Sequence, residues 1–327
     1  MKAEREQNMA FFGNVYTVFI QVMVLAVMVA VGFFGDRFGY FTEHAARLCN
    51  NLLFYVITPC VIVNSFLSVE YTRQSAGGFF TAFVCALVFH ALAAVFSLFL
   101  FRKGDRDKNI IYKYATVYGN TGYMGLPLAK AVMDAVAGNG EIGVFYCSAA
   151  VAAFNLFCFT HGVWLMSGSG GKDKFNWKKL IVNPGTLSVA AGLPLFLLNI
   201  SLPQVLTAPI EHLGSMNTPL AMVMFGTYLS KADFGAAFRQ KNMYVAALMK
   251  LAVIPLAMIG LFRVCGITGN LLIVASVFVS APSANNTVMF AAKYNRDTSL
   301  ASQVCGFTSV LSVITMPACV ALAIMLA

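Results

Sequence analysis

Charged residues are scarce in this 327-residue chain: they make up 11% of the sequence, while hydrophobic residues make up 59%. The mean hydropathy is +0.76. A soluble domain of this size needs far more charge to cover its surface, so the scarcity argues against a water-soluble protein. It indicates a chain for which lipid is the main solvent.

Groups of metal ligands and catalytic side chains are also lacking. No two of the eight cysteines have the spacing of zinc ligands, and most fall in apolar stretches, where free cysteine packs as a small apolar residue. Histidines and carboxylates do not gather at metal-ligand spacing either. We therefore expect no enzyme, no metal and no cofactor.

Long apolar stretches, in contrast, recur along the whole chain. Each has about 20 residues and is able to cross a hydrocarbon core of roughly 30 Å. They predict an all-α membrane protein with ten transmembrane helices. The first stretch is too long for a removed signal peptide and lacks a small-residue cleavage site. The expected spans are Phe11–Phe34, Leu48–Val69, Gly77–Phe101, Ile110–Val136, Ile142–Met166, Leu180–Ile200, His212–Leu229, Met243–Val264, Ile267–Tyr294 and Thr298–Leu326.

The net charge of +9 is distributed unevenly between the connections of these spans. With the N-terminus outside, the inner connections hold most of the basic residues, among them Arg102, Lys103, Arg106 and Lys108. The positive-inside rule then predicts that both termini lie outside (periplasmic or extracellular) and that the spans cross the inner (plasma) membrane. Topology explains the basic charge, so no nucleic-acid partner is expected.

The chain is predicted to consist of two halves. The longest interior polar segment, Ser167–Lys179, is rich in serine, glycine and lysine, which is typical of a cytoplasmic linker. It separates a first repeat of five spans (1–166) from a second repeat of five (180–327). An odd number of spans per repeat inverts the second one, and prolines at related positions, such as Pro127 and Pro282, support a duplication.

Two spans contain segments that cannot form a regular helix. The fourth has three glycines and a proline within Gly119–Pro127, and the ninth has a proline and five polar residues within Ser280–Thr287. Such breaks persist in a bilayer only where they line a cavity or face protein, and each exposes a half-helix N-terminus that favours an anion. Two such breaks in inverted halves predict a binding site in mid-membrane. The predicted substrate-binding residues are Asn120, Thr121, Gly122, Gly125, Pro127, Pro282, Ser283, Asn285 and Asn286.

Further polar residues inside the spans are candidates for function because such groups are costly in lipid. Lys130 either adds positive potential at the site or extends outward to the interface. Lys250 lies deeper, and the sequence favours a supporting role over contact with substrate. His90 and His161 favour structural hydrogen bonds, with proton coupling as the alternative. The predicted cavity or charge-supporting residues are Lys130, Lys250, Asn64, Ser65, Asn155 and His161.

Acidic residues are absent from the interior of every expected span. Antiporters that exchange cations through buried carboxylates need such groups, so a cation antiporter is disfavoured. Sodium binding through carbonyl, hydroxyl and amide oxygens stays open. A carrier driven by the membrane potential also stays open, because moving one charge is worth about 2.3 kcal/mol per 100 mV.

Several motifs carry a family resemblance. The segment Asn120–Pro127 has the pattern N-x-x-x-x-G-x-P, and Pro282 precedes Phe290-Ala-Ala-Lys-Tyr-Asn295. In these motifs, in Asn183-Pro184, and in Lys250 followed by Pro255, the chain resembles the auxin efflux carrier family. That family includes plant auxin exporters and bacterial permeases for malate or malonate. The resemblance extends from about residue 11 to the C-terminus, and the short central linker is similar to that of the prokaryotic branch.

The resemblance implies a ten-helix fold related to bile-acid/sodium symporters and sodium/proton antiporters, in which broken helices 4 and 9 cross at the membrane midplane. It also implies an elevator-like motion of a transport domain, made of spans 3–5 and 8–10, against a scaffold of spans 1, 2, 6 and 7. By position, Asn120 and the segment around Pro282 are expected to contact a substrate carboxylate. A homodimer is compatible with this arrangement.

We therefore expect a secondary transporter that moves small organic anions, such as malate, malonate or auxin-like acids, by alternating access. The alternative is a sodium-dependent symporter of larger amphipathic anions of the bile-acid type. The expected partners are the organic anion, the lipid bilayer and a coupling proton or sodium ion.

Overall fold

The computed structural model describes residues 16, 20, 23–167, 183–230 and 240–327. Within these ranges the protein is helical, and its only β-type pairing is one isolated bridge. Five helical segments are long and apolar enough to cross a membrane, and two shorter apolar helices accompany them. The five are His44–Ser68, Arg73–Ser97, Gly140–Ser167, Lys241–Val264 and Thr298–Leu326. As the sequence predicts, these are the features of a multi-pass membrane protein.

The first half, as described, contains a helix over residues 23–37 followed by five further helical segments. Three of the five contain a short π-helical turn (η), and the other two are α-helical throughout. The bounds are α2 (Glu43–Leu52), η1 (Leu53–Ile57), α3 (Thr58–Ser68), α4 (Arg73–Ser97), α5 (Arg106–Val117), η2 (Thr121–Gly125), α6 (Leu126–Ala137), α7 (Gly140–Phe157), η3 (Cys158–Gly162) and α8 (Val163–Ser167).

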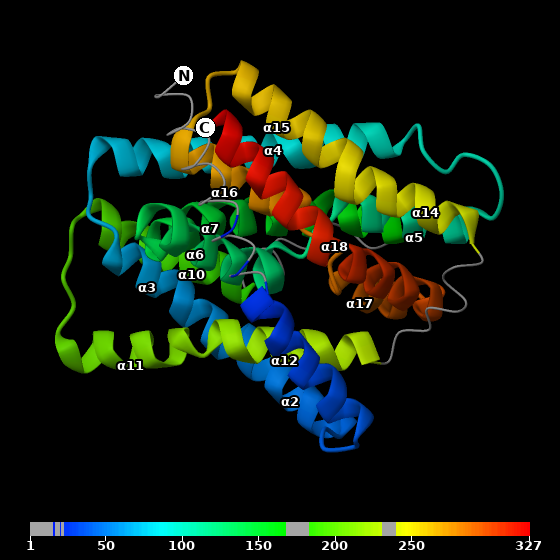
Figure 1. Ribbon diagram of the computed structural model, residues 1–327, viewed down its shortest axis with the longest axis horizontal. Helices are drawn as coiled ribbons and strands as arrows, with labels where there is room; N and C mark the ends of the chain where they lie inside the picture. Colours follow the sequence, from blue (N-terminus) through cyan, green and yellow to red (C-terminus); the bar gives the residue numbers. More distant parts are fainter. Residues whose placement is uncertain (1–15, 17–19, 21–22, 168–182, 231–239) are drawn as a thin grey trace.

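The second half ends in the longest helix of the described chain, α18. Figure 1 shows α11 and α12 following one another end to end. The bounds are α10 (Pro184–Leu197), α11 (Gln204–Ser215), α12 (Asn217–Ser230), α14 (Lys241–Leu248), η4 (Met249–Val253), α15 (Ile254–Val264), α16 (Gly269–Ser280), α17 (Asn286–Lys293) and α18 (Thr298–Leu326).

Prolines mark three of the four π-helical turns. Pro59, Pro127 and Pro255 each stand at the second position of the α-helix that follows η1, η2 and η4. Proline has no N–H group, so the carbonyl one turn earlier loses its partner, and its ring crowds the same carbonyl. A wide turn before the proline relieves this conflict without ending the helix. These local departures from α-helix therefore follow directly from the sequence.

Both predicted interruptions are present. The fourth span is divided into α5 and η2–α6, and the ninth into α16 and α17. Four predicted starts are wrong by four or more residues, because the helices of the second, third, fourth and seventh spans begin at Glu43, Arg73, Arg106 and Gln204 rather than at Leu48, Gly77, Ile110 and His212. The third span begins at Arg73 rather than Gly77, because Thr72 and Ser75 form a reciprocal capping box with two 2.9 Å hydrogen bonds. The seventh begins at Gln204 rather than His212, because the polar residues before His212 lie within α11.

Two other expectations fall largely outside the described residues. The linker Ser167–Lys179 is described only at its first residue, and the first span Phe11–Phe34 is described continuously only from residue 23. The division into repeats at 1–166 and 180–327 therefore stays a prediction.

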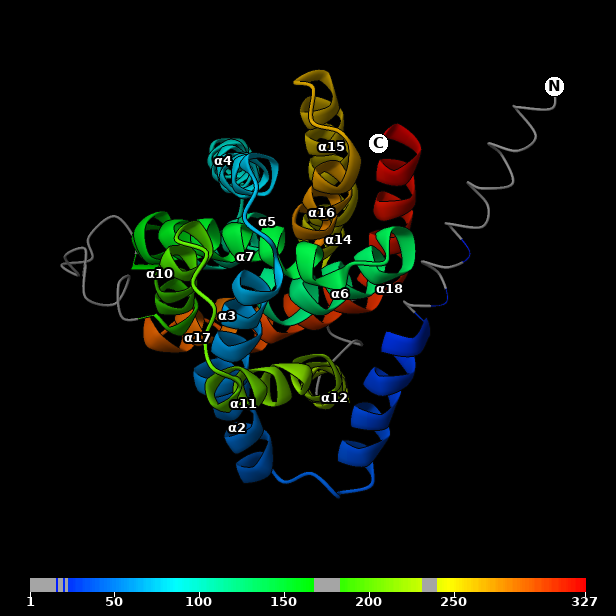
Figure 2. The ribbon, with the colours of Figure 1, turned by 90° about the vertical axis from the view of Figure 1, so that its left-hand side faces the viewer.

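The helices pack in layers. Figure 2 shows α4, α14, α15 and α16 on one side, α2, α3, α11, α12 and the helix of residues 23–37 on the other, and α6 and α7 between them. Between neighbouring helices, α4 packs against α7, α7 against α6, and α3 against α10 and α11. The apolar core includes residues of both broken helices.

Close packing of α12 against the helix of residues 23–37 depends on two glycines. A Cβ atom on Gly226 would lie 2.0 Å from the Val29 carbonyl oxygen, and one on Gly32 would lie 1.9 Å from the Val223 carbonyl oxygen. We expect Gly226→Ala to force the helices apart, cost about 1–3 kcal/mol and lower the melting temperature by several degrees. The melting temperature is measured by heating the purified protein and using size-exclusion chromatography to find the fraction that stays folded.

Gly260→Ala in α15 is the matched control, because a Cβ atom there would meet no neighbour within 4 Å. Alanine favours a helix over glycine, so this control is expected to be neutral or slightly stabilising. Equal melting temperatures for the two variants would contradict the packing argument.

Candidate functional site

The two broken helices cross by pairing their extended segments. Gly119 and Ser283 form an isolated antiparallel bridge. On either side of it, the Asn120 N–H donates to the Pro282 carbonyl at 2.7 Å, and the Ala284 N–H donates to the Tyr118 carbonyl at 2.9 Å. Backbone groups that a broken helix leaves open inside a membrane thus find partners in the other broken helix.

Side chains hold this crossover in place. The Ser283 hydroxyl donates to the Ala115 carbonyl at the end of α5, at 2.9 Å. The Ser283 N–H donates to the Thr308 hydroxyl on α18, at 3.2 Å, and the Cys305 thiol contacts the Ala284 carbonyl at 3.3 Å. Ser283 therefore acts as a link in the crossover, with its hydroxyl turned to the protein.

The crossover places two helix N-termini next to each other. Asn120 caps the continuous helix formed by η2 and α6, and its side-chain oxygen accepts the Tyr123 N–H at 3.3 Å. Asn285 precedes the first residue of α17, and no side chain caps that helix. The first N–H groups of a helix have no partner within it and carry a partial positive charge. The site is therefore electropositive without needing a charged side chain.

A small pocket of about 60 Å³ lies at these N-termini. This is room for a few water molecules or for one carboxylate group. Of the predicted substrate-binding residues, it is lined by Asn120, Thr121, Gly122, Asn285 and Asn286. Asn155 on α7, predicted as a cavity residue, also lines it.

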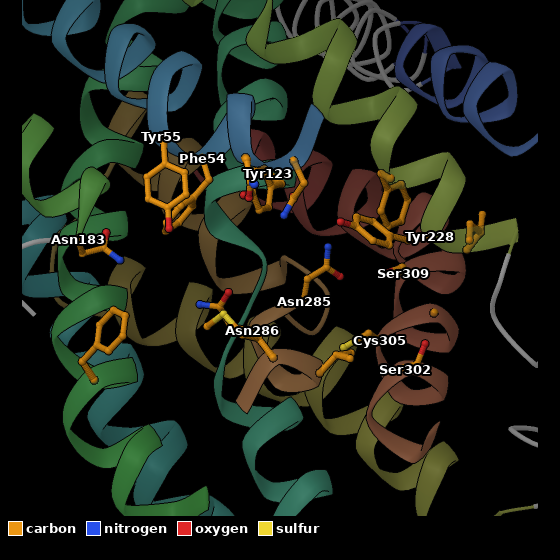
Figure 3. Close-up of a pocket in the computed structure, with 18 residues that line it drawn as sticks. Phe54, Tyr55, Tyr123, Asn183, Tyr228, Asn285, Asn286, Ser302, Cys305 and Ser309 are labelled. Carbon is orange, nitrogen blue, oxygen red and sulfur yellow. The ribbon is translucent and has the colours of Figure 1, made fainter. Parts of the chain in front are cut away.

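A larger pocket of about 480 Å³ adjoins the small one and shares Phe54, Tyr123, Asn183, Asn285 and Asn286 with it. Its size lies within the range of about 300–1,000 Å³ that is usual for ligand sites. Figure 3 shows Asn285 and Asn286 on one side of the pocket, facing Tyr123 on the other. None of the described residues that line either pocket is acidic or basic. The aromatic lining consists of Phe54, Tyr55, Tyr123, Phe159, Phe225 and Tyr228.

Asn155 and Asn183 connect two helices at the edge of the small pocket. The Asn155 amide donates to the Asn183 side-chain oxygen at 3.1 Å, and that oxygen also accepts the Gly185 N–H at the start of α10. Asn183 is thus the N-cap of α10 and a pocket residue at once. The sequence offered one signal for this role, the Asn183-Pro184 pair.

Other predicted residues lie away from the pockets. Lys130 pairs with Glu141 across α6 and α7, which satisfies its charge locally. The Ser65 hydroxyl donates to the Ile62 carbonyl of its own helix at 2.7 Å, and Asn64, on the same helix, lines neither pocket. Gly125 packs against Thr121 and Cys147. Pro127 and Pro282 are buried and shape the backbone, and they do not line the pockets.

Lys250 and two histidines lie beside the crossover. Lys250 is fully buried, and its ammonium group lies 5.2 Å from the centre of the Phe89 ring. Nearby, the His90 Nδ1–H donates a 2.7 Å hydrogen bond to the Ala86 carbonyl. His161 makes a 2.8 Å hydrogen bond with the Tyr118 hydroxyl. Each histidine thus has the structural hydrogen bond that the sequence favoured.

Sequence reasoning missed the aromatic lining of the larger pocket. Tyr55, Tyr123 and Tyr228 come from three different segments, and apolar spans contain many other aromatic residues that line nothing. The only signal was a hydroxyl group within an apolar stretch, which is weak because tyrosine is also common at membrane interfaces.

The cysteines and acids form no site of their own within the described ranges. No group of three or more His, Cys, Asp or Glu side chains there is able to hold a metal ion. The eight cysteines are free, and five of them are buried in helix packing.

A protein family and two named proteins match most of the chain in sequence. Residues 17–320 match the sequence model of a family described as membrane transport protein. The chain is 26% identical over 320 residues to a Methanocaldococcus jannaschii protein named "Uncharacterized transporter", covering 90% of this chain and 95% of that protein. It is 24% identical over 296 residues to a Rhizobium meliloti protein named "Putative malonate transporter", covering 86% of each.

Proposed function

The chain belongs to the membrane transport protein family, the auxin efflux carrier family that its motifs resemble, and on this premise we propose that it carries small organic anions. The substrates are carboxylates such as malonate, malate or auxin-like acids. Transport proceeds by alternating access across the inner membrane. The malonate transporter named among its relatives supports this substrate class.

One observation carries the proposal: two helix N-termini meet at a pocket, and none of the described residues that line it is charged. A helix N-terminus offers unpaired N–H groups and a positive dipole end, which together bind carboxylates and phosphates. A cation at the same place would face the positive ends of two helix dipoles, and none of the described lining residues is an acid that would attract it. The geometry therefore favours an anion.

The two adjoining pockets suggest how a substrate is held. A carboxylate fits the small pocket, where the Asn120, Asn285 and Asn286 side chains and the N-termini of both helices surround it. The rest of the molecule extends into the larger pocket between Phe54, Tyr123 and Tyr228. The asparagine amides bind the substrate carboxylate by hydrogen bonds, and the aromatic lining selects the apolar part of the substrate by its shape.

The larger pocket also supports an elevator-type mechanism. One wall comes from the expected scaffold, with Asn50, Tyr55 and Tyr228, and the other from the expected transport domain, with Asn285 and Ser302. A substrate in this cleft is held between two bodies that are able to slide past each other. In a ten-span, inverted-repeat topology with both termini outside, these lining residues fall on the inner half of the membrane, so we assign this conformation to the inward-facing state.

A second candidate rests on the aromatic lining. Six aromatic side chains around about 480 Å³ would also suit larger amphipathic anions, as in a sodium-dependent symporter of the bile-acid type. Sodium would bind through carbonyl, hydroxyl and amide oxygens. Sodium-dependent binding of such an anion distinguishes this candidate from the first.

Flux in proteoliposomes tests the proposal. We expect the purified protein to take up labelled malonate, malate or indole-3-acetate with saturable kinetics, and the Asn120→Ala/Asn285→Ala double variant to lose at least about 100-fold in uptake. Each asparagine offers hydrogen bonds to a charged group, and such bonds are worth about 1.5–3 kcal/mol each. Separate liposomes with sodium, proton and potential gradients identify the driving force.

Asn270→Ala is the matched control, because Asn270 is exposed at the opposite end of α16. It is expected to transport as the unmodified protein does. Undiminished carboxylate uptake by the double variant would refute the site assignment. Absence of uptake of every acid under every gradient would refute the substrate class.

A further inference from the structure

Lys250 occupies an unusual place for a basic side chain. It belongs to η4, in the middle of the apolar segment Lys241–Val264, and is completely shielded from solvent. Its Nζ atom makes no hydrogen bond within the described part of the chain. It also reaches the crossover, because a Cβ atom on Gly119 would lie only 2.9 Å from it. A lysine so enclosed is stable as an ammonium ion only when negative charge is nearby.

No salt bridge joins Lys250 to an acidic side chain in the part of the chain that the structure describes. The buried titratable side chains on the helices around η4 are histidine, tyrosine and cysteine, and the acid on α5, Asp107, is exposed and paired with Arg296 at 2.5 Å. Carbonyl groups at the broken helix ends are partly consumed, because those of Ala115, Tyr118 and Pro282 accept hydrogen bonds across the crossover. On the helices near η4, the buried titratable groups are His90 and Cys85 on α4, Tyr112, Tyr114 and Tyr118 on α5 or just after it, and Cys305 and Cys319 on α18.

The missing negative charge is supplied when a substrate anion binds at the crossover. Gly119, which Lys250 approaches, is itself a lining residue of the small pocket. A carboxylate there stabilises the ammonium form of Lys250, and the ammonium form in turn strengthens carboxylate binding. Coupling of this kind is reciprocal by thermodynamic necessity.

A line of polar side chains leads from this region towards one end of the helices. His90 lies next to Phe89, with ring centres 4.8 Å apart, and its Nε2 atom has no hydrogen-bond partner in the described chain. Its ring is 6.2 Å from that of Tyr118, whose hydroxyl bonds His161 at 2.8 Å. His161 is partly exposed and stands 5.7 Å from Trp164, which is exposed.

We propose that Lys250 is the proton-binding site of the transporter and that its Nζ atom takes up one proton when the substrate anion binds. The proton comes from water on the inner side, through His161, Tyr118 and His90, and converts the neutral amine to ammonium. Anion and proton then cross together, and the proton leaves Nζ for water when the anion is released. The inference rests on the proposed carboxylate transport and adds its coupling ion.

The direction of the pH effect follows from this linkage. Low pH protonates Lys250 and strengthens anion binding, whereas high pH leaves the amine neutral and weakens it. For one linked proton, the dissociation constant rises by at most about tenfold per pH unit over the range in which Lys250 titrates. Between about pH 7 and pH 9 the carboxylates of the substrate are already ionised, so its own titration does not contribute.

The experiment follows labelled malonate and a pH-sensitive dye in the same proteoliposomes, together with malonate binding between about pH 7 and pH 9. The unmodified protein is expected to move one proton with each malonate beyond the leak of empty liposomes, and to bind malonate more weakly as the pH rises. Lys250→Met is expected to bind malonate with an affinity that does not change with pH and to move it without protons. Lys241→Met, an exposed lysine at the start of the same segment, is expected to behave as the unmodified protein.

Two outcomes overturn the inference: malonate flux in the unmodified protein without proton movement, or proton coupling that survives in Lys250→Met. The first is decided without any variant, so a misfolded Lys250→Met protein leaves the proposal testable. His161→Gln adds a test of the route, with slower proton uptake from the inner side and an unchanged pH dependence of binding at equilibrium. Absence of flux of malonate, malate and indole-3-acetate alike in the unmodified protein refutes the proposed function itself, whereas flux of one of the other two acids moves this experiment to that acid.

Discussion

Replacing Asn285 by aspartate is expected to weaken carboxylate binding roughly a thousandfold. Asn285 lines both pockets, and Figure 3 shows it opposite Tyr123 in the larger one. A carboxylate at this position would face the substrate carboxylate. Two like charges about 4 Å apart repel by about 4 kcal/mol at an effective dielectric constant of about 20, which corresponds to roughly three powers of ten in affinity. Binding titrations with malonate and uptake in proteoliposomes measure the loss.

This substitution separates an electrostatic effect from damage to the fold. Asn and Asp have nearly the same shape, and an acid before α17 favours its N-terminus, so Asn285→Asp is expected to unfold at the same temperature or higher. Asn270→Asp, at the exposed start of α16, introduces the same charge away from the pockets and is expected to bind normally. Unchanged anion affinity in Asn285→Asp, with the protein folded, would show that the anion binds elsewhere.

Filling the small pocket is expected to abolish transport without destabilising the protein. Gly122 lines this pocket, and a Cβ atom placed on it would meet no neighbour within 4 Å. The side chain of Gly122→Leu therefore enters open space of about 60 Å³ and leaves no room for a carboxylate. Leucine also favours a helical turn over glycine by up to about 1 kcal/mol. We expect carboxylate uptake to fall at least about 100-fold while the melting temperature is kept.

Gly260→Leu is the control for this prediction, because Gly260 also has open space around it but lies on α15, away from the pockets. Gly122→Ala, with a single added methyl group, is expected to lie between the unmodified protein and Gly122→Leu. Full uptake by Gly122→Leu would mean that the substrate does not enter the small pocket.

Local features of the sequence determined the helices and where they break. Long apolar stretches predicted membrane helices because a bilayer core leaves backbone groups no partners outside the chain. The glycines and proline of Gly119–Pro127 and the proline and polar residues of Ser280–Thr287 predicted the two interruptions, because glycine and proline disfavour a regular helix. The motif Asn120–Pro127 also indicated the family, which the match over residues 17–320 confirms.

Tertiary structure alone decided what these pieces do together. The pairing of Gly119 with Ser283 joins residues 164 positions apart, and no periodicity in the chain specifies that register. Lys130 was a candidate for the anion site until packing placed it beside Glu141, and Asn64 was a cavity candidate until the fold placed it outside both pockets. A hydrophobic pattern gives the length of a helix, but in a uniformly apolar span it does not say which face meets protein.

The pocket lining shows the same limit most clearly. Phe54, Tyr123, Tyr228 and Asn286 come from four separate segments, and their convergence depends on how the helices cross. The sequence alone indicates that Lys250 lies deep within its span. Only the packing shows that it approaches Gly119 and that its Nζ atom has no hydrogen-bond partner among the described residues. The sequence by itself determined which segments enter the membrane and where helix termini are exposed, because these depend on local chemistry. The shape and charge of the site depend on side chains brought together from distant positions.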